Sequence, residues 1–163
     1  MKKLIFVLLM LVSIGSFAQS PTTIILVRHA EKASEGGNDP ELSDAGKQRA
    51  ELLAKTLSKT KVTAIYSTPY KRTKNTVAPL ATAKNLTIET YNPKPEELDA
   101  LIQKNKGGTV VVAGHSNTTP SFVNYLTGNK GEYPNFDDAD YGNIIIVTFV
   151  EKGKDVKVVW MSY

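Results

Sequence analysis

The chain has 163 residues, of which 41% are hydrophobic and 22% charged, with a formal charge of +4 and no cysteine. This composition fits one ordinary globular domain and is too apolar for a disordered chain. The lack of cysteine excludes a disulfide-built miniprotein, a thiolate-bound zinc or iron–sulfur site, and a cysteine nucleophile.

The N-terminal segment has the layout of a secretory signal peptide. A basic start precedes an apolar run from Leu4 to Ile14, and small residues follow up to Ala18. The run is roughly half as long as a helix that spans a bilayer. We therefore expect residues 1–18 to be removed and residues 19–163 to form one periplasmic or secreted domain without stable membrane insertion. An uncleaved N-terminal anchor is the alternative.

Removal of the segment takes away two lysines and no acidic residue, so the charge falls from +4 to +2. This modest balance gives no reason to expect nucleic acid as a partner.

Apolar, β-branched runs alternate with amphipathic segments along the rest of the chain. In chain order we predict a strand at 23–27, a helix at 43–58 that Ser43 caps, a strand at 62–66, a helix at 69–84 that Pro79 must end or bend, a strand at 86–90, a helix at 95–104, a strand at 109–113, a helix at 117–126, and a hairpin of strands at 144–150 and 156–161. The alternation predicts an α/β fold, a three-layer α/β/α sandwich with a mostly parallel central sheet.

The two histidines of the chain, His29 and His115, each follow a strongly apolar predicted strand. Ligands of open α/β sheets bind beyond the carboxyl ends of the strands, so we expect both imidazoles on one rim. A lone histidine is usually a packing residue, but this paired placement favours a functional site. Histidine suits such a site because it keeps a nucleophilic or proton-carrying nitrogen at neutral pH.

The three arginines of the chain are Arg28, Arg49 and Arg72. Arg28 precedes the first histidine, and Arg72 follows the second predicted strand. Arginine grips phosphate through a planar fork, whereas lysine offers only a point charge. A positive charge in the first turn of a helix opposes the helix dipole, which gives Arg72 a reason to bind an anion. We interpret Arg49 as a surface residue of its helix.

Other chemistries fit the sequence less well. The segment GHSNT at 114–118 is a near miss for the nucleophile elbow of serine hydrolases, but that class needs a histidine after its serine. The chain contains no P-loop, dinucleotide-binding or H-E-x-x-H motif. A metal held by both histidines and a carboxylate stays open as an alternative. We expect no metal, because the neighbouring arginines repel a cation.

Four segments, in order, resemble the signature of a known family. Residues 28–31 (RHAE) resemble R-H-G-E, and residues 42–50 (LSDAGKQRA) resemble L-T-x-x-G-x-x-Q-A. Residues 66–76 (YSTPYKRTKNT) resemble S-S-P-x-x-R-x-x-Q-T, and residues 112–116 (VAGHS) resemble a strand end V-x-H-G/S. The family is the histidine phosphatase superfamily, the phosphoglycerate-mutase-like proteins of branch 1. The chain is similar in size to the small phosphohistidine phosphatases.

The resemblance implies a phosphoglycerate-mutase-like fold and a phosphatase that needs no metal or other cofactor. His29 is then the nucleophile that carries a phosphohistidine intermediate, and Arg28, Arg72 and His115 bind the phosphoryl oxygens. Ser116 is a candidate substrate-binding residue. We expect a small phosphorylated substrate or a phosphoprotein as the partner. The alternative is a phosphate- or phospholigand-binding module with the same pocket but without turnover.

The sequence departs from the family pattern at three places. Ala30 replaces a glycine, Asn75 replaces a glutamine, and the acidic motif expected after the third strand is missing. The candidate proton donors that remain are Glu96, Glu31, Asp138 and Asp140. Without a dedicated donor, leaving groups such as phosphohistidine, acyl phosphate or aryl phosphate are favoured over alkyl phosphates.

Overall fold

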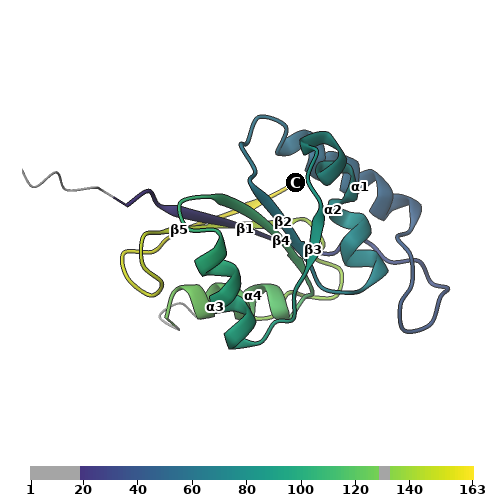
Figure 1. Ribbon diagram of the computed structural model, residues 1–163. Coiled ribbons are helices and arrows are strands. Elements are labelled where there is room, and N and C mark those ends of the chain that lie inside the picture. The colour runs from purple at the N-terminus through teal and green to yellow at the C-terminus, as the bar shows by residue number, and fades with distance from the viewer. Residues whose placement is uncertain (1–18, 129–132) are drawn as a thin grey trace, which may run out of the picture.

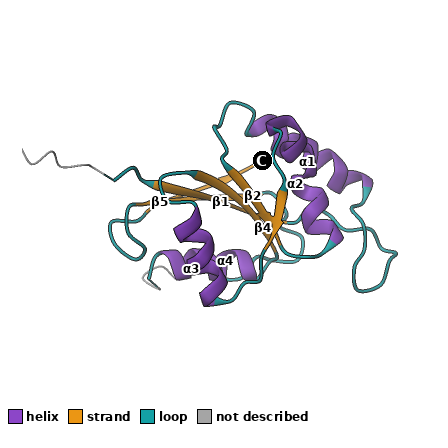
Figure 2. Cartoon of the chain, viewed as in Figure 1, coloured by secondary structure: helices purple, strands orange, loops and turns teal. Residues whose placement is uncertain are grey.

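The computed structural model describes residues 19–128 and 133–163, and in this part of the chain a six-stranded sheet carries helices on both faces (Figures 1 and 2). The signal peptide expected at residues 1–18 lies outside the described residues. Within them, no helix is long and apolar enough to cross a membrane. In chain order the elements are β1 (Thr22–Arg28), α1 (Asp44–Thr56), β2 (Ala64–Ser67), α2 (Lys71–Lys84), β3 (Ile88–Thr90), α3 (Pro95–Lys104), β4 (Thr109–Gly114), α4 (Thr118–Leu126), β5 (Asn143–Phe149) and β6 (Lys157–Ser162).

The strands follow the order β3-β2-β4-β1-β5-β6. β3, β2, β4 and β1 pair in parallel, whereas β5 pairs antiparallel with both β1 and β6. The mostly parallel sheet is therefore confirmed. In register, Arg28 at the end of β1 lies opposite Gly114 of β4, and Ser67 at the end of β2 lies opposite Ala113. The segments that follow β1, β2 and β4 thus leave the sheet at one edge, where ligands bind in such folds.

The central strands are buried on both faces, which explains their unbroken apolar runs. In β1, Ile24 and Leu26 pack in the core beneath α3 and α4, while Ile25 and Val27 pack beneath α1 and α2 (Figure 1). The alternation follows from the two-residue period of a strand. Two apolar layers therefore hold the sheet between helices, as the three-layer prediction requires.

The helix ends agree with the local signals in the sequence. The Gly46 amide donates to Ser43 Oγ at 3.1 Å, which confirms Ser43 as the N-cap of α1. Pro95 is the first residue of α3, where its missing N–H costs nothing. α2 continues through Pro79 to Lys84, because Leu80 beyond the proline is buried in the core and its packing offsets the missing hydrogen bond.

Candidate active site

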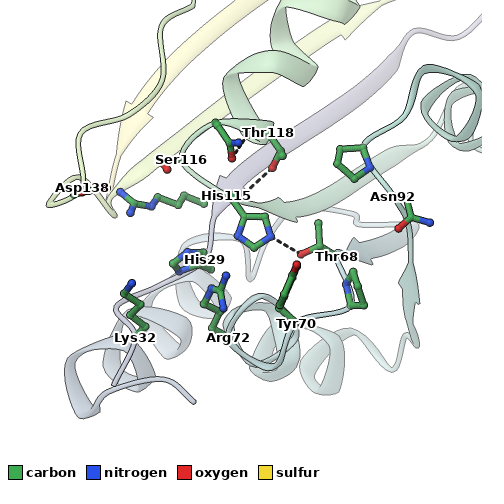
Figure 3. A pocket seen from close by; sticks show the side chains of 14 residues that line it. His29, Lys32, Thr68, Tyr70, Arg72, Asn92, His115, Ser116, Thr118 and Asp138 are labelled. Carbon is green, nitrogen blue, oxygen red and sulfur yellow. Dashed lines mark hydrogen bonds between the residues drawn. The ribbon is translucent and has the colours of Figure 1, made fainter. Parts of the chain in front are cut away.

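The four residues singled out in the sequence meet in one pocket of about 510 Å³ at the carboxyl edge of the sheet (Figure 3). Arg28 and His29 come from the end of β1, Arg72 from the first turn of α2, and His115 from the residue after β4. The parallel order β2-β4-β1 causes this convergence, because each strand delivers its following segment to the same rim. The volume is ordinary for a small-molecule site.

His29 is 6% exposed, and one of its ring nitrogens is fixed. Its Nδ1 lies 2.8 Å from the carbonyl oxygen of Ala30, which can only accept, so Nδ1 carries the hydrogen. The lone pair of the neutral ring is then on Nε2. Burial is the main cause that lowers the pKa of His29 to about 4 against the ordinary 6.5. The hydrogen bond to Ala30 opposes the shift, and the neighbouring His115, Arg72 and Arg28 add to it. At neutral pH the ring is therefore uncharged, with a lone pair on Nε2.

His115 stands edge-on to His29, with the ring centroids 5.4 Å apart, and its Nε2 lies 3.0 Å from Thr68 Oγ1. Burial is the first cause that lowers its pKa to about 4, with Arg72 and Arg28 adding to the effect. The preceding glycine is required by close packing. A Cβ on Gly114 would lie 2.9 Å from the hydroxyls of Thr118 and Thr119.

Arg28 ties the pocket to the loop before β5. Its side chain is 4% exposed, and Nη1 donates to the carbonyl oxygens of Asp137 at 2.7 Å and Asp140 at 3.0 Å. The guanidinium lies 4.2 Å from the ring centroid of Tyr141, a cation–π contact. Its Nε is buried and has no hydrogen-bond partner among the described residues.

Arg72 is held in the same way from the opposite side. Its Nη1 donates to the carbonyl oxygen of Asn38 at 3.2 Å, and its guanidinium lies 4.7 Å from the ring centroid of Tyr70. Its Nε is also buried without a partner in the described part of the chain. Buried donors normally have acceptors, so two unpartnered guanidinium nitrogens in one pocket point to an anionic ligand.

Glu31, a candidate proton donor, does not line this pocket, so its position gives no support for that role. Its carboxylate is bound by Arg49, with Nε 2.9 Å from both carboxylate oxygens and Nη2 2.6 Å from Oε1. These hydrogen bonds hold the pKa of Glu31 below its usual range, so the group is ionised at neutral pH. Arg49 is accordingly no free surface residue, because three-quarters of its side chain is buried and Nη1 also donates to the carbonyl of Tyr163.

The other candidate donors differ in position. Glu96 is exposed at the start of α3 and does not line the pocket, so its placement gives no support for a role there. Asp140 contributes its backbone carbonyl to Arg28 rather than a carboxylate to the pocket. Asp138 is the one carboxylate that lines the pocket among the described residues. Ser116 also lines it.

The pocket also contains side chains that the sequence did not single out, among them Lys32, Thr68 and Tyr70 (Figure 3). Thr68 and Tyr70 flank the proline of the Arg72 motif, which is a signal that could have identified them. Lys32 follows the RHAE motif by one residue but has no distinguishing pattern around it.

Two small residues allow the RHAE segment to pack closely. The Cβ of Ala30, where the family pattern has glycine, fits between Leu42 and Ala50, and its backbone φ is negative. The Ala30 amide donates to Thr76 Oγ1 at 2.8 Å, so the residue is held from α2. On Gly46 a Cβ would lie 2.2 Å from the carbonyl oxygen of Glu31. The substitution at position 30 is therefore tolerated, whereas one at position 46 is not.

The family model of the histidine phosphatase superfamily (branch 1) matches residues 24–92, a stretch that includes His29 and Arg72. Over this stretch the chain is similar to the superfamily. His115 lies beyond the matched stretch, and its position opposite His29 completes the pair that the superfamily pattern implies. Among the described residues, no group of three His, Asp or Glu side chains is arranged to hold a metal ion.

One curated relative is phosphoserine phosphatase 1 of Hydrogenobacter thermophilus, 46% identical over 71 residues. The match covers 40% of this chain and about a third, 34%, of the relative's length. Among solved structures, the protein histidine phosphatase SixA complexed with tungstate has a TM-score of 0.70, 22% identity, and coverage of 86% of this chain and 96% of its own. Phosphoserine phosphatase from Entamoeba histolytica, complexed with 3-phosphoglyceric acid, has a TM-score of 0.65, 20% identity, and coverage of 87% and 98%. These structures share the fold of this chain.

Proposed function

We propose that this chain is an exported, metal-independent phosphatase that acts through a phosphohistidine intermediate on His29. The observation that carries the proposal is the set of charged and uncharged groups that meet in the pocket. A neutral histidine keeps a free Nε2 lone pair beside two arginines, Arg28 and Arg72, whose buried Nε atoms have no partner within the described residues. A nucleophile surrounded by unpartnered, permanently charged donors fits a phosphoryl group.

In the proposed first step, the Nε2 lone pair of His29 attacks phosphorus. The bond between phosphorus and the leaving-group atom, an oxygen in an acyl or aryl phosphate and a nitrogen in phosphohistidine, breaks, and its electron pair goes to that atom. Arg28 and Arg72 stabilise the charge on the equatorial oxygens, a role that positive charge performs in phosphoryl transfer generally. Water then attacks phosphorus, the electron pair of the P–N bond returns to His29, and inorganic phosphate leaves.

The chemistry of the leaving group decides which phosphorylated compounds we expect to react fastest. Asp138 is the carboxylate in the pocket that could protonate a leaving oxygen, and it is exposed rather than enclosed. We therefore expect phosphohistidine, acyl phosphates or aryl phosphates to react faster than alkyl phosphates. Phosphoserine, which two relatives named above act on, is the alkyl ester to include in the comparison. The partner is a small phosphorylated molecule or a phosphoprotein.

A panel of these phosphoesters, assayed with the wild type and with His29→Ala, tests the proposal. We expect hydrolysis by the wild type, insensitivity to EDTA, and loss of turnover in the variant. Lys59→Gln, at an exposed site on the loop after α1, is the matched control and should match the wild type. If the wild type binds phosphate but hydrolyses none of the panel, the pocket belongs to a binding module. Loss of activity in EDTA that added metal restores would indicate a metalloenzyme instead.

A further inference from the structure

Two buried threonines form a line of contacts that ends at Nε2 of His115, and the first of them, Thr68, also lines the pocket. The His115 Nε2 lies 3.0 Å from Thr68 Oγ1, and Thr68 Oγ1 lies 2.9 Å from Thr73 Oγ1. Thr73 Oγ1 in turn lies 2.8 Å from the carbonyl oxygen of Tyr70 and 3.1 Å from that of Thr68. Thr68 is 2% exposed and Thr73 is 0% exposed, so water does not reach this line of contacts.

The number of hydrogens in this line fixes their direction. A threonine hydroxyl has one hydrogen, and a carbonyl oxygen only accepts. Thr73 lies within hydrogen-bond distance of two carbonyl oxygens, of which that of Tyr70 is the nearer, so its one hydrogen is donated to a carbonyl. The 2.9 Å contact between the two threonines must then use the hydrogen of Thr68. Nothing is left for Thr68 to donate to His115, and the imidazole must donate to Thr68.

The opposite direction is unfavourable. If Thr73 donated to Thr68, its oxygen would face two carbonyl oxygens at 2.8 and 3.1 Å with no hydrogen between them. Burial would prevent water from relieving that repulsion.

We propose that the Thr68–Thr73 relay fixes His115 as the tautomer protonated on Nε2, and that both threonines are positioning residues for the phosphoryl site. The inference rests on the proposed function for its purpose, but the tautomer itself does not depend on turnover. The other edge of the His115 ring, with Nδ1, faces His29 and Arg72 (Figure 3). His29 has the opposite tautomer, with its hydrogen on Nδ1. Each histidine therefore uses its one N–H to donate a hydrogen bond to the protein. The other ring nitrogen, which carries a lone pair, is left to face the ligand.

This arrangement assigns different tasks to two similar rings. The lone pair of His29 attacks phosphorus, whereas that of His115 accepts the proton of a phosphoryl hydroxyl. His115 can contact an unprotonated phosphoryl oxygen only after its Nδ1 has gained a proton. The relay thus sets which form of the phosphoryl group the second histidine recognises.

Nitrogen-15 NMR of the imidazoles tests the inference directly, because the chain has two histidines and His29→Ala assigns both signals. In the free wild type at neutral pH, we expect His29 protonated on Nδ1 and His115 on Nε2. Thr73→Val removes the acceptor of the Thr68 hydroxyl, which can then donate to Nε2, so His115 should change to the Nδ1 tautomer. Thr68→Ser should retain the wild-type tautomer, as should Thr82→Val at an exposed position of α2.

Kinetics give a second readout that does not need Thr73→Val to fold. Thr68→Val should lower kcat for an aryl phosphate by roughly tenfold, the order expected for one lost hydrogen bond to a catalytic group, and Thr68→Ser should restore it. His115 found on Nδ1 in the free wild type, or a Thr73→Val spectrum equal to the wild type, would overturn the relay. The NMR result stands even if the protein hydrolyses nothing, so failure of the relay and failure of the phosphatase proposal are distinguishable.

Discussion

His29 differs from a free histidine in both tautomer and basicity. The Ala30 carbonyl holds the hydrogen on Nδ1, and burial together with the two neighbouring arginines and His115 makes protonation of the ring unfavourable. A histidine with its ordinary pKa of 6.5 would lose nucleophilicity just below neutral pH. The pocket instead keeps the ring neutral into the acidic range.

We therefore expect the acidic limb of the kcat/KM profile to lie near pH 4 rather than 6.5, for a substrate whose own ionisation is corrected for. The same shift affects stability. Between pH 6.5 and about pH 4 the two histidines bind protons in the unfolded state but not in the folded state. The free energy of unfolding therefore falls as the pH is lowered through that window. A pH series of activity and urea unfolding measures both. An acidic limb at the ordinary histidine pKa would contradict the assigned environment.

Replacement of either pocket arginine by lysine should lower activity. Arg28→Lys and Arg72→Lys each keep the charge but lose the fork, so we expect kcat for an aryl phosphate to fall by about 10²-fold, as when one transition-state donor is removed. The matched control is Lys59→Arg, which exchanges the same two residue types at an exposed position after α1 and should leave kcat unchanged. Activity within twofold of the wild type in both lysine variants would mean that a point charge suffices.

At the level of elements, the approach of α1 to the RHAE segment depends on Gly46. A Cβ there would lie 2.2 Å from the Glu31 carbonyl oxygen, and backbone must move to admit it. We expect Gly46→Ala to destabilise the protein by about 1–3 kcal/mol despite the better helix propensity of alanine. Urea unfolding measures the change, with Thr56→Ala at the exposed end of α1 as the control. Unchanged or increased stability would show that the contact is relaxed in solution.

The sequence predicted the four central residues of the site because strand ends and motif spacing are local signals. His29, Arg72 and His115 each follow an apolar run that could be recognised without neighbours. The role of Glu31 could not be predicted in this way, because its partner Arg49 lies on another element, and helix periodicity shows no difference between a solvated arginine and a paired one. The same limit applies to Asp138, which reaches the pocket through a loop far along the chain.

At the scale of the whole molecule, the order of the strands in the sheet determines which segments lie together at the site. Alternating strands and helices predict a parallel sheet with helices on both faces, but many strand orders satisfy that pattern. Only the pairing of β4 between β2 and β1 places the three segments that carry the site next to one another. Hydrophobic periodicity contains no information about which strands are neighbours, so this part of the fold needed the structure.

The proposed export of the full-length chain can be tested separately from catalysis. Expressed in a bacterium as the full-length chain, the protein should appear in the periplasm or the medium with Gln19 as its first residue, because the small residues up to Ala18 provide a cleavage site. Intact-mass measurement of the fractionated protein checks the prediction. A full-length mass in the membrane fraction would favour the uncleaved anchor.

The central claim is that phosphate passes through a covalent bond to His29. Rapid mixing with an aryl phosphate labelled on phosphorus, followed by a denaturing quench and peptide mapping, tests it most directly. We predict a label that is stable to base and labile to acid, on the peptide that contains His29, formed within the first turnover and missing in His29→Ala. Turnover by the wild type without such a label, or with the label on another residue, would contradict the account.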